Sequence, residues 1–202
     1  GGVRTKTGRL LNLGTITLSG PVRALSTGGV RIDGSAVVGQ TLSVVATGWP
    51  VGAELQYQWY RDGRRIRGAT QATRVLTASD LHRRISVRVR GSLGGARSVQ
   101  VTARLGSRVS RGQIVAGTAE IAGTATPGQV LTVTTAGWQP SGVHLHYRWL
   151  RDGRSIRRAT HAGYRLSAAD LNHQISVRVT GTARGYHSAA VISAPVGVTA
   201  VG

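Results

Sequence analysis

The sequence YQWYRDGRRI occupies residues 57–66, and ninety residues later a close copy, YRWLRDGRSI, occupies residues 147–156. Apolar and polar residues alternate in the first half of each copy, which is the period of a β-strand with one buried face. The Asp-Gly pair that follows supplies the two positive-φ positions of a tight hairpin turn. Each copy therefore predicts a strand, a two-residue turn and a second strand, with Trp59 and Trp149 as core anchors on the inner face.

Other motifs repeat in the same order around this hairpin. They are GQTL and GQVL at 39–42 and 128–131, AT at 69–70 and 159–160, ASDL and AADL at 78–81 and 168–171, and ISVRV at 85–89 and 175–179. The segments are short, alternate with period two and show no helical periodicity. We therefore predict an all-β chain of two tandem immunoglobulin-like β-sandwich domains. Their expected limits are residues 30–106 and 119–202, with a linker at 107–118 and an N-terminal extension at 1–29.

These motifs together resemble the bacterial Ig-like repeats of actinobacterial secreted and cell-surface proteins. The resemblance covers roughly residues 30–196. It implies non-catalytic modules that serve as spacers, adhesive units or wall-association units, and it implies an extracellular or cell-surface location. The chain departs from antibody-type domains because it has no cysteine to form their inter-sheet disulfide.

The charge is strongly one-sided. The chain carries 26 Lys and Arg against 7 Asp and Glu, a formal net charge of +19, and all the basic residues except Lys6 are Arg. A GC-rich genome explains the choice of Arg over Lys, but it does not forbid acidic residues. The shortage of acidic residues therefore indicates an anionic partner. An anionic cell-wall polymer is favoured over nucleic acid, because Tyr60 is the one ring interleaved with the arginines as a stacking platform.

Eleven arginines form the predicted anion-binding face. Four of them flank the two Asp-Gly turns, where they should oppose each other across the hairpin as unfavourable pairs of like charge. We therefore expect their replacement by Gln to leave stability unchanged or to raise it. The others extend the hairpins or project from the outer face of a neighbouring strand. The set is Arg61, Arg64, Arg65, Arg67, Arg88, Arg90, Arg151, Arg154, Arg157, Arg158 and Arg178.

The sequence does not indicate an enzyme. Four of the seven acidic residues occupy turns or corners at equivalent positions in the two copies: Asp62, Asp80, Asp152 and Asp170. A glycosidase-like carboxylate pair would thus require residues that already have structural roles. His144 and His146 share one face of a predicted strand, but no Cys and no nearby carboxylate completes a metal site. We predict no catalysis, no metal and no cofactor.

Trp49 and Trp138 precede loops at equivalent places and permit two interpretations. Their rings are either exposed platforms for sugar stacking or caps that close the end of each sandwich. Capping is favoured because Trp side chains are usually largely buried.

Residues 1–29 match neither repeat and contain an apolar run from Leu11 to Leu18. An unpaired apolar strand promotes aggregation, so we expect this run to complete a preceding domain or to dock on a neighbouring subunit, which permits self-assembly. No apolar run approaches the ~18 residues of a transmembrane helix. The chain begins at Gly1 without a signal sequence, so we expect any such segment to have been removed or to lie outside this piece.

The function predicted from the sequence is a non-catalytic extracellular pair of Ig-like modules with a structural or adhesive role on a bacterial surface. Contact with anionic polymer is expected through the arginines. Two alternatives remain open. The chain is either a subunit of a larger assembly, such as a surface filament or a virion decoration, or a carbohydrate-binding accessory module of a secreted hydrolase that uses Trp49 and Trp138.

Overall fold

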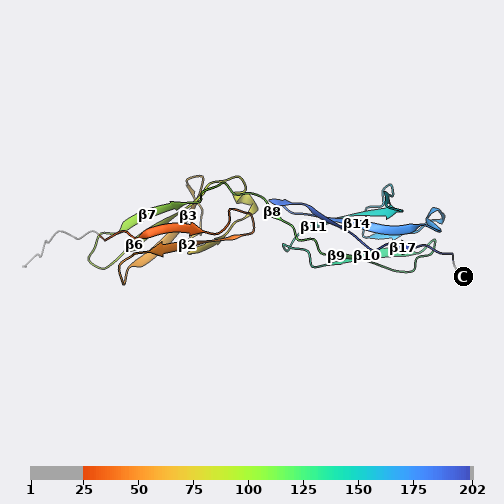
Figure 1. Ribbon diagram of the computed structural model, residues 1–202, viewed down its shortest axis with the longest axis horizontal. Helices are drawn as coiled ribbons and strands as arrows, with labels where there is room; N and C mark the ends of the chain where they lie inside the picture. Colours follow the sequence, from red (N-terminus) through yellow and green to blue (C-terminus); the bar gives the residue numbers. More distant parts are fainter. Residues whose placement is uncertain (1–24, 201–202) are drawn as a thin grey trace, which may run out of the picture.

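A computed structural model describes residues 25–200 as two β-sandwiches joined end to end (Figure 1). The apolar run from Leu11 to Leu18, and with it the expected docking role of the N-terminal extension, lies outside the described residues. Between residues 25 and 200, no helix is long and apolar enough to cross a membrane.

The first sandwich, called module 1 below, packs a sheet of order β1-β2-β5 against a sheet of order β4-β3-β6-β7. Every pairing within these two sheets is antiparallel. The elements are β1 (Gly29–Asp33), β2 (Thr41–Thr47), β3 (Glu54–Arg61), β4 (Arg64–Arg65), β5 (Thr73–Val75), the 3-10 turn η1 (Ala78–Asp80), β6 (Ile85–Ser92) and β7 (Val99–Arg104).

The second sandwich, module 2, repeats this plan. One sheet has the order β9-β10-β13, and the other has the order β12-β11-β14-β16, with β17 also paired to β14. The elements are β9 (Thr118–Ala122), β10 (Val130–Ala136), β11 (His144–Arg151), β12 (Arg154–Ser155), β13 (Gly163–Arg165), η2 (Ala168–Asp170), β14 (Gln174–Thr182), β16 (Ala189–Ile192) and β17 (Val196–Gly197). The prediction of two tandem Ig-like sandwiches is confirmed.

The β3-β4 hairpin has the predicted two-residue turn. Asp62 and Gly63 have φ values of 46° and 78°, both in the left-handed region that this turn requires. Asp152 and Gly153 give φ values of 46° and 76° in module 2. The turn sets the register, so Arg61 lies opposite Arg64 and, in the second copy, Arg151 lies opposite Arg154.

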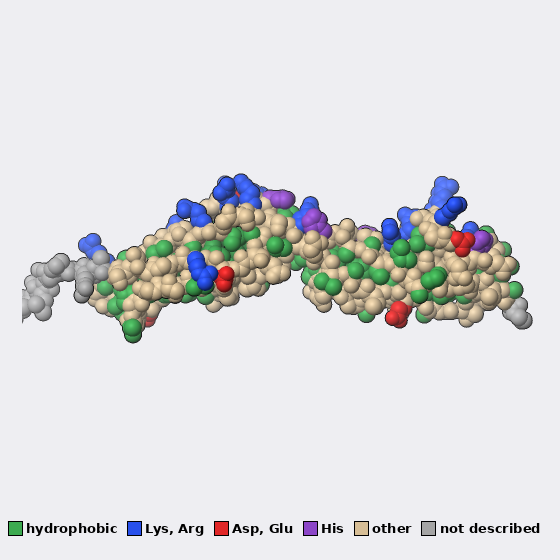
Figure 2. All heavy atoms as spheres, viewed as in Figure 1, with side chains coloured by type: hydrophobic (Ala, Val, Ile, Leu, Met, Phe, Trp, Pro, Cys, Tyr) green, Lys and Arg blue, Asp and Glu red, His purple; other side chains and the backbone are tan. Residues whose placement is uncertain are grey.

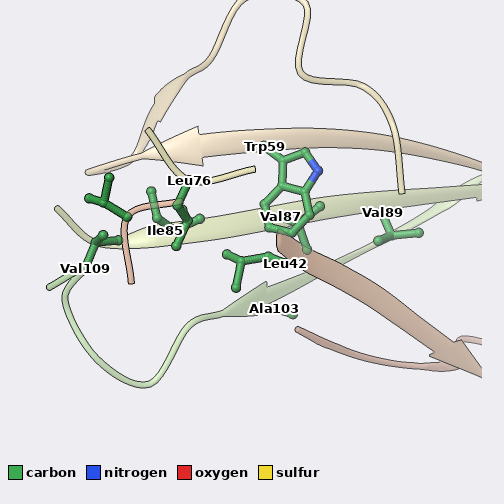
Figure 3. Close-up of a cluster of buried hydrophobic side chains, with 9 residues drawn as sticks. Leu42, Trp59, Leu76, Ile85, Val87, Val89, Ala103 and Val109 are labelled. Carbon is green, nitrogen blue, oxygen red and sulfur yellow. The ribbon is translucent and has the colours of Figure 1, made fainter. Parts of the chain in front are cut away.

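A tryptophan lies at the centre of each core. Trp59 and Trp149 are both 0% exposed, and their Nε1 atoms donate to the carbonyl oxygens of Gln71 at 2.8 Å and His161 at 2.9 Å. In module 1 the indole packs between strands of the two sheets, with Leu42 and Val87 beside it (Figure 3). The core is otherwise aliphatic, so the indole provides much of its buried apolar area.

The modules are joined by paired backbone and by one inserted ring. After β7 the chain still packs against module 1, because Val109 is buried in its core. It then forms β8 (Gly112–Gln113), which pairs in parallel with β15 (Tyr186–His187) of module 2. The Tyr186 ring packs against the module 1 core, and a Cβ atom added to Gly39 would lie 2.5 Å from its hydroxyl. Part of the segment 107–118, which was expected to act as a linker, therefore packs against the two modules.

Candidate functional site: arginines of the hairpins and the sheet face

A buried carboxylate organises the base of the hairpin in module 1. Asp80 is 0% exposed and accepts hydrogen bonds from Arg61 Nε at 2.8 Å and from Arg74 Nη2 at 2.9 Å. The Thr77 amide and hydroxyl donate to the same carboxylate at 2.8 and 3.0 Å, which caps η1. Burial alone would raise the pKa of Asp80, but the Thr77 amide and the two guanidinium groups outweigh burial and hold this pKa below its ordinary value.

Module 2 builds the same site with one substitution. Asp170 is 0% exposed and accepts from Arg151 Nε at 2.8 Å and from the Ser167 amide at 2.7 Å. Tyr164 replaces Arg74, and its hydroxyl donates to Asp170 at 2.9 Å while its ring stacks on Trp149 with centroids 5.5 Å apart. Burial again opposes ionisation, yet the net effect of these donors is to lower the pKa of Asp170.

These contacts correct the expectation about the charges at the hairpin turns. Arg61 and Arg151 lie opposite Arg64 and Arg154 in register, but both guanidinium groups turn toward a buried aspartate. They are structural partners of a buried charge, so replacing them with Gln should lower stability rather than leave it unchanged or raise it. The signal that sequence reasoning missed is that each Arg repeats together with an Asp nineteen residues later.

The remaining hairpin arginines surround an open hollow on each module, called the hairpin hollow below. In module 1 it has a volume of about 670 Å³, and Arg64, Arg65 and Arg67 line it without forming an ion pair within residues 25–200. Arg83, also in its lining, is paired with Asp62 at 3.2 Å. The Asp62 carboxylate also accepts from the Arg84 amide at 2.8 Å, which fastens the turn to the start of β6.

The hairpin hollow of module 2 measures about 530 Å³ and is lined by Arg154 and Arg157. Its turn carboxylate, Asp152, is fastened to the Gln174 amide at 2.9 Å and to the His173 ring. Arg158 occupies the following loop, exposed, with a φ of 61°. Basic side chains gather along the same side of both modules in Figure 2. The duplicated hairpin thus places guanidinium groups that form no ion pair within residues 25–200 at equivalent points of both modules, Arg64 with Arg154 and Arg67 with Arg157.

The other predicted arginines lie on the outer face of the larger sheet of each module, as their alternation indicated. Arg88 and Arg90 are exposed on β6, and Arg178 is exposed on β14 opposite Arg148. The guanidinium carbon of Arg88 lies 4.7 Å from the centroid of the Tyr60 ring, which is a cation–π arrangement.

Trp49 and Trp138 are half-buried and lie across the ends of the sandwiches. The Trp49 ring extends from Gly28, beside β1, to Gly91 in β6, and so contacts both sheets of module 1. Trp138 lies between Gly117 and Gly181 in the same way. Nε1 of each indole is buried. The geometry favours the end-capping interpretation over sugar stacking.

We expect Gly91→Ala to destabilise module 1 by about 1–3 kcal/mol, the range for overpacking a filled site. The added Cβ atom would lie 2.2 Å from Trp49 Cζ3, so the ring would have to move. Thermal unfolding of the full chain measures this, with Gly94→Ala as the control because a Cβ atom there meets nothing within 4 Å. Equal melting of the two variants would contradict the capping role of Trp49.

The described residues offer no group of three or more His, Cys, Asp or Glu side chains that could hold a metal ion. His144 and His146 are exposed on β11, and His146 Nε2 lies 3.1 Å from the Thr182 hydroxyl.

No protein-family model and no curated protein matches the sequence. Among solved structures, the chain is similar to a Ca²⁺-stabilised adhesin that helps an Antarctic bacterium reach out and bind ice, with 13% identity over 88% of this chain, 50% of that chain and a TM-score of 0.40. It is also similar to three N-terminal domains of the outer capsid protein Hoc of bacteriophage RB49, with 19% identity over 83% of this chain, 59% of that chain and a TM-score of 0.37. A third similar structure contains tandem Ig repeats of Dlar, with 11% identity over 89% of this chain, 97% of that chain and a TM-score of 0.31. The chain therefore spans between half and three fifths of the adhesin and Hoc structures, and at these identities the likeness concerns the fold alone.

Proposed function

We propose that this chain is a non-catalytic pair of Ig-like modules on a bacterial surface, with a structural or adhesive role, and that it binds anionic polymer through its arginines. The observation that supports the proposal is the duplicated hairpin hollow. Arg64, Arg65 and Arg67 in module 1, and Arg154 and Arg157 in module 2, form no ion pair within the described part of the chain. Exposed cationic groups of this kind attract polyanions at long range.

The hairpins are well suited to hold these charges in place. Each turn is fastened at its tip by Asp62 or Asp152 and at its base by the buried Asp80 or Asp170. A polymer that binds such a hairpin has little backbone to order, which lowers the entropic cost of each contact. Two modules on one chain then raise the effective concentration of the second contact, so weak single sites give avid binding.

The test is the salt dependence of polymer binding by the variant Arg64→Gln/Arg154→Gln. Both side chains are exposed and unpaired among residues 25–200, so we expect the variant to remain folded. Removing two counterion-releasing contacts should lower the slope of log K against log salt by up to about 2. The measurement is a titration with purified teichuronic acid, an anionic wall polymer that contains uronate sugars, at several salt concentrations, with duplex DNA titrated in parallel.

The control is Arg31→Gln/Arg165→Gln, which removes the same formal charge from the opposite sheets, on β1 and β13. Unlike Arg64 and Arg154, Arg31 is paired with Asp33 at 3.5 Å and Arg165 donates to the Gly128 carbonyl at 2.7 Å. We expect the control to keep most of the slope. If the hairpin variant keeps the wild-type slope of log K against log salt, the hairpin arginines do not bind the polymer. Codon usage would then explain the basic composition. Equal loss in both variants, or equal affinity for DNA, would indicate a nonspecific polycation and leave the proposal without its support.

A further inference from the structure

The outer face of the β4-β3-β6-β7 sheet contains a second hollow, of about 490 Å³, called the sheet-face site below. Its polar lining includes Gln56, Tyr60, Arg88, Arg90 and Gln100. Strand register places Arg90 between Gln56 and Gln100 on one rung, and it places Arg88 beside Gln58 on the next. The volume falls within the range of about 300–1,000 Å³ that small-ligand pockets occupy.

The cationic groups of this site are held in position by neutral neighbours. The Tyr60 ring lies under the Arg88 guanidinium at 4.7 Å, and Arg90 Nη2 donates to the Ser98 hydroxyl at 3.0 Å. Arg65 Nε donates to the Gln58 side chain, whose amide in turn donates to the Ile66 carbonyl at 2.8 Å. Within residues 25–200, none of these three arginines is paired with a carboxylate. Their positive charge is therefore ordered and available to a ligand.

Module 2 does not repeat this site, although its sheet is equivalent. Leu150, which is buried, occupies the place of Tyr60, and Thr180 occupies the place of Arg90. Ser155 and Ala190 stand where module 1 has Arg65 and Gln100. Arg88 has a counterpart in Arg178, and Arg148 of module 2 stands at the place of Gln58. Arg65 and Arg90, the aromatic ring under Arg88 and the Gln100 amide are what module 1 has alone. The difference indicates a role specific to module 1.

We propose that the sheet-face site binds an acidic saccharide, a sugar ring that carries a carboxylate, as one unit of the anionic polymer in the proposed function on which this inference rests. Guanidinium groups bind a carboxylate through paired, charge-assisted hydrogen bonds. The amides of Gln56 and Gln100 both donate and accept, so they suit ring hydroxyls on either side of that charge. Two aromatic residues, Tyr57 and Tyr60, line the site. Tyr57 packs against the core, and the Arg88 guanidinium covers one face of the Tyr60 ring, so a nucleic acid finds little ring surface for base stacking and fits the site less well.

The experiment titrates the full chain with a hexamer of galacturonic acid by calorimetry. We expect Arg88→Gln/Arg90→Thr to weaken binding at least tenfold. Neither residue lines the hairpin hollow, and both side chains are exposed, so thermal unfolding should be unchanged. The matched control is Arg148→Gln/Arg178→Gln, which removes two arginines from the same sheet face of module 2 and should change affinity less than twofold.

Three results would overturn the inference. They are an unchanged dissociation constant in Arg88→Gln/Arg90→Thr, an equal loss in the module 2 control, and binding of a neutral maltohexaose or of a single-stranded DNA hexamer as tightly as the uronate. Failure of the proposed function gives a different pattern. If the sheet-face site alone fails, the slope of log K against log salt for teichuronic acid is still lower in the hairpin variant Arg64→Gln/Arg154→Gln than in the wild type. If the proposed function fails, the hairpin variant keeps the wild-type slope.

Discussion

Trp59→Ala should destabilise module 1 by roughly 3–5 kcal/mol, the range for emptying a buried aromatic site. The indole is 0% exposed, its Nε1 atom donates to the Gln71 carbonyl at 2.8 Å, and the rest of the core is built from smaller aliphatic side chains. Small domains have total stabilities of about 5–15 kcal/mol, so a loss of this size leaves module 1 largely unfolded near its former melting temperature. Calorimetry of the full chain measures the change.

Trp149→Ala supplies the matched comparison, because it empties the equivalent site of module 2. Each variant should shift the transition of its own module more than that of the other. Some coupling is expected, since Tyr186 of module 2 packs against the module 1 core. A Trp59→Ala chain that melts like the wild type would contradict the place of this residue in the core.

The hairpin could be predicted from sequence because its information is local. The alternation around Trp59 specifies which side chains are buried, and the Asp-Gly pair specifies the turn and therefore the register. The exposed positions of Arg88, Arg90 and Arg178 follow from the same alternation. Arg61 shows the limit of this reasoning. It ends β3 with its side chain free to turn. Its partner Asp80 lies nineteen residues later, beyond β4 and β5, and the sequence pattern does not specify the path of the chain between them.

The junction between the modules could not be predicted for a similar reason. The Gly, Ser and Arg residues near 106–114 indicate a linker, which was expected at 107–118, whereas Val109 and Ile114 within that segment are buried. Tyr186, whose ring the junction accommodates, comes more than seventy residues later and has Ala96 as its counterpart in module 1. Because the Tyr186 contact occurs in one module only, comparison of the two repeated sequences does not reveal it.

The Asp80 site leads to the other large expected effect. Asp80→Asn removes the charge that neutralises Arg74, whose side chain is 10% exposed, and Arg61, whose side chain is 31% exposed. Breaking a buried pair from one side typically destabilises by about 3–5 kcal/mol, because the remaining charge is left buried without a partner. Asp170→Asn should cause a smaller loss, since Arg151 is the one arginine bound there and Tyr164 is neutral. Urea unfolding of the full chain measures both.

Acid should reproduce the effect of Asp80→Asn in the wild-type chain. The folded-state pKa of Asp80 is lowered, so its stabilising contribution is fully present above the unfolded pKa of about 3.9 and is lost as the pH falls through the folded-state value. We expect the stability of module 1 to fall below about pH 4, and the Asp80→Asn variant to lack this part of the pH dependence. Equal losses for Asp80→Asn and Asp170→Asn, or a wild-type module 1 whose stability is constant from pH 6 to pH 2, would contradict the interpretation that Asp80 acts as a buried charge between two arginines.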